Sequence, residues 1–463
     1  MEKNTIIIIG GGFSGTLTAV NIIRASQSDK LQVLLIEREA EVGRGLAYRF
    51  GDDNLLLNVP AGNMSALADE PDHLIAYCQA IDPALNAKSF ISRRMYGDYL
   101  EHSLAEAASG TPGALHTIIG EAVAVTRDAT SHTLRVELAC GSVFEAPQVV
   151  LALGHFPPKF PLAIIEEVQK HVVNPWDFNA MDRLDPDKPI AVIGMGHTAI
   201  DVVFRLTSCN SRRKVFLISR RGLLPLGHRI NPILPTASGY PTYLVGLAPT
   251  VRAYTRAVRR EVAYRQLTGG NWRDVINELR PHTPALWLSL LERERRRFLK
   301  TILPYWDIHR HRLSPIATSR LERLIKSGQV TRIAAKIVSI APNSDDILVE
   351  LKARLSCESQ QVAVSAVINC TGPNQDLSTV STPLMEQLLK AGMLQQDPLH
   401  LGLLLDDSYR VIDANNRTVP GLFYVGPMLK AKFWESIAVP ELRGHTLKLA
   451  QALATETSRT SIP

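Results

Sequence analysis

Two glycine-rich segments contain the residues whose types and spacing could bind phosphate groups. Residues 10–15 read GGGFSG and residues 194–199 read GMGHTA, so both fit the pattern Gly-x-Gly-x-x-Gly/Ala. In this pattern the first glycine permits a tight turn, the second lets the backbone approach a pyrophosphate, and the third position lets the next helix pack closely. The pyrophosphate then lies at the helix N-terminus, which carries partial positive charge. The expected phosphate-binding residues are Gly10, Gly12, Phe13, Ser14 and Gly15 in the first segment, and Gly194, Gly196, His197 and Thr198 in the second.

The strand end that follows each segment indicates which nucleotide binds there. Glu37 ends the first such strand, where a carboxylate accepts hydrogen bonds from the adenosine ribose. Aligning LLIERE with FLISRR places Ser219 opposite Glu37, and Arg220 and Arg221 follow Ser219. A carboxylate would repel a 2′-phosphate, whereas a hydroxyl and two guanidinium groups would bind it. We therefore predict FAD in the first unit, beside Glu37 and Arg38, and NADPH in the second. The alternative is a vestigial second unit whose arginines are only solvated.

The elements around both segments follow the order strand, turn, helix, strand. The strand segments are short, apolar and rich in β-branched residues, which is typical of buried parallel strands. Two such units in one chain indicate an internal duplication. The sequence therefore predicts an α/β fold with two Rossmann-like, three-layer dinucleotide-binding domains. The expected elements are residues 5–9, 16–25 and 31–36 in the first unit, and 189–193, 200–206 and 214–218 in the second.

The remaining segments suggest how the domains divide. Alternating polar and apolar residues predict antiparallel strands at residues 122–137 and 142–148, and apolar runs predict buried strands at 149–153 and 366–369. A proline-containing segment at 174–177, with Pro186, predicts a crossing between domains. The expected domains are residues 1–185 and 335–463 for FAD and 186–334 for NADPH, with a basic helical insertion at about 250–312.

Composition excludes several classes of function. The 463 residues suit two or three domains, and 45% hydrophobic and 21% charged residues are ordinary for a globular protein. The basic runs lack interleaved aromatic residues, so we expect no nucleic-acid partner. No run approaches the roughly 20 apolar residues of a membrane span, and the start does not read as a signal peptide, so we expect a cytoplasmic protein. Neither C-x-x-C nor metal-ligand spacing occurs, so we expect no metal and no redox disulfide. The five cysteines are Cys78, Cys140, Cys209, Cys357 and Cys370.

Motifs along nearly the whole chain resemble those of a known family. They are GGGFSGTLTAV, VGRGLAY, LLNVPAGNMS, RRMYGDYL, LALGHFPP, GMGHTAID, WDIHRHRLSP, INCTGP and GLFYVGPMLKAKFWESIAVPELRG. In this order they resemble two-dinucleotide-domain flavoproteins, most closely a bacterial group of FAD/NAD(P)-binding proteins related to flavin-dependent N-hydroxylating monooxygenases. The resemblance implies a glutathione-reductase-like FAD domain.

The resemblance also implies further contacts to FAD. The residues added in this way are Gly43, Arg44 and Gly45 along the pyrophosphate, Asn58 near the flavin ring, Val123 at the adenine, Gly154 at a crossing between domains, Gly426 beside the ribityl chain, and Glu435 and Ser436 closing one side of the flavin. Related reductases carry Gly-Asp where this chain has Gly426-Pro427, so the usual carboxylate contact to the ribityl chain is missing or comes from elsewhere. For Glu435 and Ser436, a buried helix entry is an equal alternative.

FAD and NADPH in one chain predict an oxidoreductase, in which hydride moves from nicotinamide to flavin. Because no cysteine pair stands near either glycine-rich segment, a disulfide acceptor is disfavoured. We expect dioxygen as the acceptor instead. The resemblance implies a monooxygenase that hydroxylates a small polar molecule, and acidic amino acids such as aspartate are candidates because some relatives of this group are thought to N-hydroxylate them. The resemblance is incomplete, because only His171 and Pro175 fit the monooxygenase pattern F-x-G-x-x-x-H-x-x-x-W/P. The alternatives are an NADPH oxidoreductase that serves a quinone or a protein partner, and a nucleotide-binding redox sensor.

The segment WDIHRHR is the expected substrate clamp. Its arginines offer bidentate donors to a carboxylate or phosphate, which would suit an acidic substrate. An ion-paired helix end that joins domains is the alternative. The residues concerned are Trp306, His309, Arg310 and Arg312. No residue is assigned a catalytic role from sequence.

Overall fold

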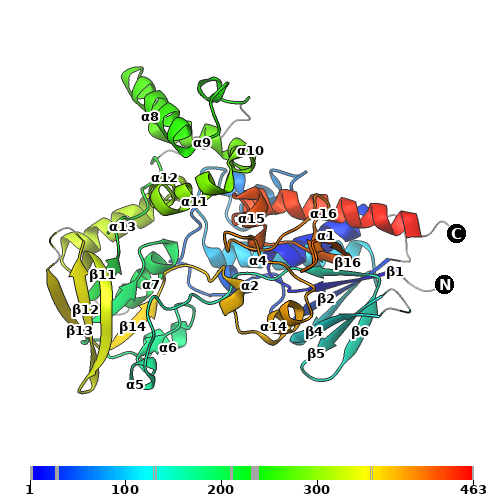
Figure 1. Ribbon diagram of the computed structural model, residues 1–463, viewed down its shortest axis with the longest axis horizontal. Coiled ribbons are helices and arrows are strands. Elements are labelled where there is room, and N and C mark those ends of the chain that lie inside the picture. Colours follow the sequence, from blue (N-terminus) through cyan, green and yellow to red (C-terminus); the bar gives the residue numbers. More distant parts are fainter. Residues whose placement is uncertain are drawn as a thin grey trace.

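Two β-sheets form separate bodies, and a helical arm projects from between them (Figure 1). The computed structural model describes residues 4–26, 31–128, 130, 133–208, 212–230, 239–354, 356 and 358–460. Cys209 and Cys357 lie outside these ranges, as do residues 129, 131 and 132 of the predicted antiparallel strands. Within the described ranges, every helix is too short or too polar to cross a bilayer.

The first sheet joins the two ends of the chain. Its order is β15-β16-β7-β1-β2-β3, and every neighbouring pair is parallel except β15 with β16. Since β16 pairs with β7, the C-terminal segment completes the sheet that the N-terminal segment begins. The strands are β1 (Asn4–Ile9), β2 (Leu31–Glu37), β3 (Leu115–Ile119), β7 (Gln148–Leu151), β15 (Arg410–Ile412) and β16 (Thr418–Tyr424).

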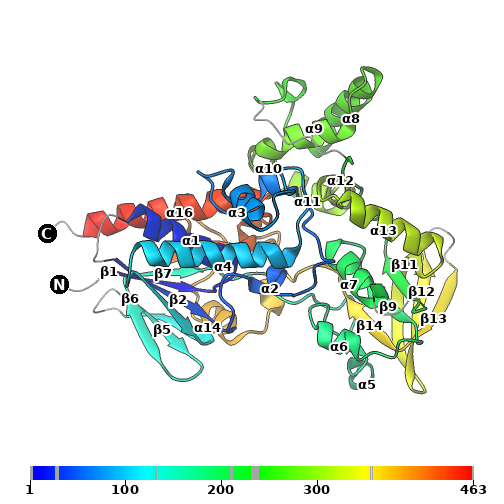
Figure 2. The ribbon, with the colours of Figure 1, turned by 180° about the vertical axis from the view of Figure 1, so that it is seen from behind.

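Three helices cover one face of this sheet (Figure 2). They are α1 (Phe13–Ala25), α4 (Arg93–Gly110) and α16 (Val439–Thr460). Helix α1 is almost wholly buried between its neighbours, and its Asn21 amide donates to the Thr446 hydroxyl at 3.2 Å. A three-stranded antiparallel sheet and α14 (Pro383–Lys390) lie together elsewhere on this body. Its strands are β4 (Ala122–Arg127), β5 (Leu134–Leu138) and β6 (Val143–Ala146).

The second sheet has the order β13-β12-β11-β10-β9-β14-β8. Strands β8 to β11 and β14 pair in parallel, whereas β12 and β13 extend the sheet as an antiparallel hairpin. The strands are β8 (Val172–Val173), β9 (Ile190–Ile193), β10 (Val215–Ser219), β11 (Val330–Asn343), β12 (Asp346–Ala353), β13 (Ser359–Val364) and β14 (Ala366–Asn369). Helices α5 (Glu166–Gln169), α6 (Phe178–Asp182), α7 (His197–Ser208) and α13 (Pro315–Lys326) accompany it.

This sheet differs from the predicted division of domains. The division at residues 186 and 334 assigns β8, β12, β13 and β14 to the FAD domain, yet all four strands belong to the second sheet. The second unit therefore extends from β8 to β14. Strand β14 pairs with β9 in the second sheet as β7 pairs with β1 in the first. Each sheet is therefore completed by a strand that lies outside its own βαβ segment.

The helical arm occupies the range in which the sequence predicts an insertion. Its helices are α8 (Val251–Leu267), α9 (Trp272–Leu279), α10 (Thr283–Ser289), α11 (Glu292–Thr301) and α12 (Leu303–Arg310). Its base packs on α15 (Lys430–Phe433) of the C-terminal segment. There Trp287 stacks on Trp434 with ring centroids 4.6 Å apart, and its indole N–H donates to the Ala431 carbonyl.

Glycine is required where each unit turns from strand to helix. Gly10 has φ of +106°, and a Cβ there would lie 2.6 Å from the Ala152 carbonyl oxygen. Gly194 has φ of +112°, and its Cβ would lie 2.1 Å from the Cys370 carbonyl oxygen. A Cβ on Gly15 would lie only 1.8 Å from the Gly10 carbonyl oxygen. These close approaches explain why Gly10, Gly194 and Gly15 carry no side chain.

Gly15→Ala therefore tests the first turn. The added methyl group meets rigid backbone, so we expect the free energy of unfolding to fall by about 3 kcal/mol or more. Gly444→Ala is the matched control, because its Cβ would meet no atom within 4 Å and it lies inside α16, where alanine should stabilise by about 0.5–1 kcal/mol. Urea unfolding followed by circular dichroism measures both, and equal midpoints would contradict the packing described.

Candidate functional site

A large cavity lies between the two units and is lined by both glycine turns. Its volume is about 2080 Å³. Ligand pockets commonly measure about 300–1000 Å³, so this cavity has room for two dinucleotides or for a dinucleotide pair with a small molecule. Both predicted nucleotide sites therefore open into one space.

The first turn presents a carboxylate at the strand end. The Gly11 amide donates to Glu37 Oε2 at 2.6 Å and the Glu39 amide donates to Oε1 at 3.1 Å, so the side chain is held toward the cavity. Backbone atoms of Gly12 and Gly45 approach so closely that a Cβ on Gly12 would lie 3.4 Å from the Gly45 Cα. The two glycines leave open a narrow cradle that side chains would fill. This arrangement fits a dinucleotide whose ribose meets Glu37.

Arg44 lies beside this cradle with its guanidinium already paired. Its Nε donates to Glu101 Oε1 at 2.6 Å and its Nη2 donates to Asp98 Oδ1 at 2.5 Å. The hydrogen bonds and charges of these carboxylates raise the pKa of Arg44, against the opposing effect of burial. Glu101 and Asp98 therefore neutralise part of the positive charge of Arg44, which is predicted from sequence to lie along the pyrophosphate.

The second turn presents hydroxyl and guanidinium groups in the corresponding place. Ser219 Oγ accepts a hydrogen bond from the Gly222 amide at 3.0 Å, and Ser219, Arg220 and Arg221 all line the cavity. Arg220 is exposed, and Arg221 Nη2 makes one long bond of 3.4 Å to the Lys300 carbonyl. Neither guanidinium forms an ion pair within the described part of the chain, so both retain donors for a 2′-phosphate.

Most of the residues predicted from sequence line the cavity. Those that do are Gly10, Gly12, Phe13, Ser14, Glu37, Arg38, Arg44, Gly45, Asn58 and Gly154 on the first unit, Gly194, Gly196, His197, Thr198, Ser219, Arg220 and Arg221 on the second, and Arg310 and Arg312 at the base of the arm. Gly15 and Gly43 lie directly behind the first turn: Gly15 packs on Gly10, and the Gly43 amide donates to the Gly11 carbonyl at 2.7 Å.

Other predicted residues are displaced from the cavity by one position or more. Ala122 lines it in place of Val123, and Pro427 lines it in place of Gly426. Glu435 and Ser436 are buried behind it, and Ile437 and Ala438 line it instead. Glu435 Oε2 accepts a hydrogen bond from Arg310 at 3.0 Å. The structure therefore favours the buried helix entry, which was the alternative for Glu435 and Ser436.

Polar contacts across the cavity rim join the two units. Arg93 at the start of α4 pairs with Asp201 on α7 at 2.9 Å, and both side chains are nearly buried. Arg205 pairs with Asp52 at 3.1 Å. His228 Nε2 donates to the Asn58 carbonyl at 3.0 Å, which places a residue of the second unit against the segment predicted to approach the flavin.

One end of the cavity is rich in arginine. Arg229 pairs with Asp274 at 2.6 Å, and Arg280 and Arg310 share Glu441. Two more arginines, Arg273 and Arg312, form no ion pair within the described residues; they donate to the Gly227 carbonyl and to Asn277 Oδ1. Burial and the neighbouring guanidinium groups lower the pKa of Arg312 to about 10. This end of the cavity therefore carries uncompensated positive charge, which favours an anionic ligand. The lining arginines are Arg229, Arg273, Arg280, Arg310 and Arg312.

Helix α12 presents a face that differs from the predicted clamp. Pro304, Asp307, Ile308 and His311 line the cavity at the i, i+3, i+4 and i+7 spacing of one helix face. Trp306 packs among apolar residues of the arm, and the His309 ring lies edge-on to Trp272 with ring centroids 4.8 Å apart. Trp306 and His309 thus face away from the cavity, and the sequence interpretation missed Asp307 and His311. The helical period would have indicated this face.

Lys430 is a second lining residue that the sequence interpretation missed. Its ammonium lies 4.7 Å from the centroid of the Trp434 ring, at the place where the C-terminal segment meets the arm. Burial lowers the pKa of Lys430, and Asp307 and Glu435 oppose this effect. The segment was singled out as a motif, but nothing in it distinguishes Lys430 from Lys432, which pairs with Asp407 away from the cavity.

Comparison with known proteins supports this description. A family described as FAD-NAD(P)-binding matches residues 7–156. An uncharacterized protein of Mycobacterium tuberculosis is 21% identical over 517 residues, covering 97% of this chain and 95% of that protein. L-lysine 6-monooxygenase from Pseudomonas syringae has a TM-score of 0.68 at 19% identity, covering 99% of this chain and 100% of that one. An ornithine N-hydroxylase from Kutzneria sp. 744, with reduced FAD, NADP⁺ and L-ornithine, has a TM-score of 0.68 at 15% identity and the same coverage.

These comparisons confirm the predicted fold class and the predicted resemblance. The chain has the fold of two-dinucleotide-domain flavoproteins over nearly its full length. The family match confirms an FAD-NAD(P)-binding unit in the N-terminal third, where Glu37 lies.

Glu37→Ala tests the adenosine end of the first unit. The substitution removes the acceptor for the ribose and frees the Gly11 amide, so we expect flavin retention to fall by about tenfold or more. The ratio of flavin to protein absorbance after gel filtration measures retention. Glu121→Ala, which removes another carboxylate from the cavity lining, is the control. Equal losses in the two variants would contradict a specific role for Glu37.

Proposed function

We propose that this protein is a flavin-dependent monooxygenase that uses FAD and NADPH to hydroxylate the amino group of a small anionic molecule, such as an acidic amino acid. The observation that carries the proposal is the arginine-rich end of a cavity that both dinucleotide turns share. Guanidinium groups without a carboxylate partner favour a ligand that brings its own carboxylates.

The overall reaction balances without a further reactant. A substrate ammonium R–NH₃⁺, dioxygen and NADPH would give R–NHOH, water and NADP⁺. Bound FAD would accept hydride from NADPH and deliver two electrons to dioxygen. The chain would contribute binding and orientation: the first turn and Glu37 would hold one dinucleotide, and the second turn with Ser219, Arg220 and Arg221 would hold the other in the same cavity.

The distribution of cysteine supports this acceptor over a disulfide. Among the described cysteines, only Cys370 lines the cavity, while Cys78 is buried elsewhere and Cys140 is exposed. Burial raises the pKa of the Cys370 thiol, which keeps it protonated and a poor nucleophile. A dithiol relay therefore has no second cysteine among the described residues of this lining.

The choice of NADPH over NADH rests on the second strand end. Replacing both Arg220 and Arg221 with alanine removes the charges expected at the 2′-phosphate, so KM for NADPH should rise by about a hundredfold, with little change for NADH. Arg323→Ala, at an exposed position on α13 outside the cavity, should leave both values unchanged. Steady-state oxidation of each nucleotide measures this, and an equal rise for NADH would contradict the assignment.

Oxygen uptake by the flavin-loaded protein tests the proposed reaction. With NADPH present, L-aspartate or L-glutamate should stimulate oxygen consumption and yield a hydroxylamine, detected by mass spectrometry as a gain of one oxygen atom. L-lysine and L-ornithine should stimulate less, because their side-chain ammonium groups would meet Arg273 and Arg312.

Arg312→Met should raise KM for the acidic substrate by about tenfold or more, while Arg256→Met, on the exposed face of α8, should not. Rapid reduction of quinones without amine-stimulated oxygen uptake would contradict the proposal and favour a reductase.

A further inference from the structure

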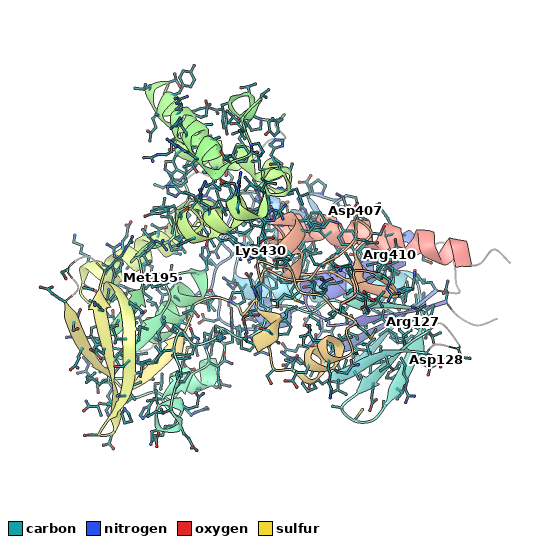
Figure 3. The ribbon with its side chains drawn as sticks, in the orientation of Figure 1. Arg127, Asp128, Met195, Asp407, Arg410 and Lys430 are labelled. Atoms are coloured by element: carbon teal, nitrogen blue, oxygen red, sulfur yellow. The ribbon has the colours of Figure 1, made fainter. Side chains whose placement is uncertain are left out.

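Asp307 occupies the junction of three parts of the chain. It lies on α12 at the base of the arm, and Lys430 of the C-terminal segment and His197 of the second glycine turn line the same cavity. Figure 3 shows Lys430 near the centre of the molecule, where the arm meets the two sheets. Asp307 therefore faces the cavity that both glycine turns line.

The Asp307 carboxylate has no partner within the described part of the chain. It forms no side-chain hydrogen bond and no ion pair there. Lys430 is charged and acts on Asp307 electrostatically, but its ammonium lies over the Trp434 ring and forms no ion pair with the carboxylate among the described residues. Arg310, one turn further along α12, is occupied by Glu435 and Glu441. Asp307 is therefore an available acceptor that faces the cavity.

The other carboxylates in the cavity lining are elsewhere or already engaged. Glu37 ends β2, and Glu39 and Glu41 follow it at the predicted adenosine end of the cavity. Glu121 lies between β3 and β4. Asp177 accepts from the Ala180 amide at 2.8 Å as the N-cap of α6. Among the described lining residues at the arginine-rich end, Asp307 is therefore the carboxylate that is available to bind a cation.

We propose, on the basis of the function proposed above, that Asp307 is a catalytic residue that binds the ammonium group of the substrate and takes one proton from it. One N–H bond of R–NH₃⁺ breaks and an O–H bond forms at the Asp307 carboxylate, which leaves the amine lone pair free to be oxygenated. No electron is transferred in this step. The proton leaves Asp307 for the product water, in agreement with the balanced overall reaction.

The arrangement of charge matches an amino acid with an additional acid group. Arg273 and Arg312 supply donors for carboxylates at one end, and Asp307 supplies an acceptor for the ammonium group one helical turn or more away. A simple dicarboxylate would leave Asp307 buried against another anion, and a diamine would leave the arginines unpaired. Both mismatches are costly in a partly desolvated site.

The environment of Asp307 suits proton transfer near neutral pH. The pKa of Asp307 is raised to about 6, because burial, with a smaller contribution from Glu435, outweighs the opposing charge of Lys430. A base is most effective when its pKa approaches the working pH. The histidines that line this part of the cavity are weaker bases, since burial lowers the pKa of His155 and His197 to about 4 and of His228 to about 3.

Amine hydroxylation should require the ionised form of Asp307. Asp307 accepts a proton only when ionised, so amine hydroxylation should fall as the pH drops through about 6. In Asp307→Asn the acceptor is absent at every pH. We expect kcat/KM for L-aspartate to fall by about a hundredfold and to lose this acidic limb. Reduction of the flavin by NADPH should be unchanged in rate, because it does not involve the amine.

Binding gives a readout that is independent of turnover. The dissociation constant of L-aspartate, measured by calorimetry on the oxidised flavin-loaded protein with NADP⁺, should rise below pH 6 for the unmodified protein and stay flat for Asp307→Asn. In Asp307→Glu the dissociation constant should again rise at acidic pH, with its midpoint at a different pH from that of the unmodified protein. Glu292→Gln, an exposed position on α11 paired with Arg296, should behave as the unmodified protein does.

The outcomes separate this inference from the proposed function. If the unmodified protein hydroxylates none of the amines in the panel, the proposed function fails. If it hydroxylates L-aspartate and Asp307→Asn keeps both the rate and the acidic limb, the role of Asp307 is overturned while the function stands. Retained flavin and normal reduction by NADPH establish that Asp307→Asn is folded. If Asp307→Asn loses its flavin, Asp307→Glu is the deciding variant. A loss of L-aspartate binding at the same acidic pH in Asp307→Glu as in the unmodified protein would then overturn the role of Asp307.

Discussion

The ion pair between Arg93 and Asp201 holds the two dinucleotide units in one relative position. Arg93 begins α4 of the first unit, Asp201 lies within α7 of the second, and both side chains are nearly buried. A buried pair adds little net stability, because desolvation offsets the attraction, but breaking it leaves an uncompensated charge. It therefore resists rotation of one unit against the other, as do Arg205 with Asp52 and His228 with the Asn58 carbonyl. Only with this orientation fixed do both glycine turns face one cavity, and hydride transfer requires that the two reacting rings meet there.

The elements that sequence predicted well are those with a local physical cause. Positions 10 and 194 require glycine because φ is positive there and because a backbone carbonyl occupies the place of a Cβ. The sequence shows this requirement as a fixed spacing of glycines. The difference between Glu37 and Ser219 can also be inferred from sequence, because each residue ends the strand that follows the glycine turn and helix of its unit. Local spacing and residue type are therefore sufficient to infer the fold class and the lining of the two turns.

The elements that sequence predicted poorly depend on contacts between distant segments. Strand β14 belongs to the second sheet because it pairs with β9, more than a hundred residues earlier in the chain, and no local pattern records that pairing. Glu435 was expected beside the flavin, but Arg310 from the arm draws it into the interior. Trp306 and His309 were chosen for their side-chain types, whereas the helical period selects Asp307 and His311. Residue type indicated the chemistry, and only the helix geometry showed which residues reach the cavity.

Anaerobic mixing of the flavin-loaded protein with NADPH tests the central claim most directly, namely that both nucleotides react within one cavity. The visible absorbance of the flavin should bleach without any added protein or mediator. Deuterium at the transferred position of the nicotinamide should slow the bleaching, because the C–H bond breaks as hydride passes directly to the flavin. Flavin that stays oxidised under these conditions, or bleaches only when a mediator is added, would contradict the account.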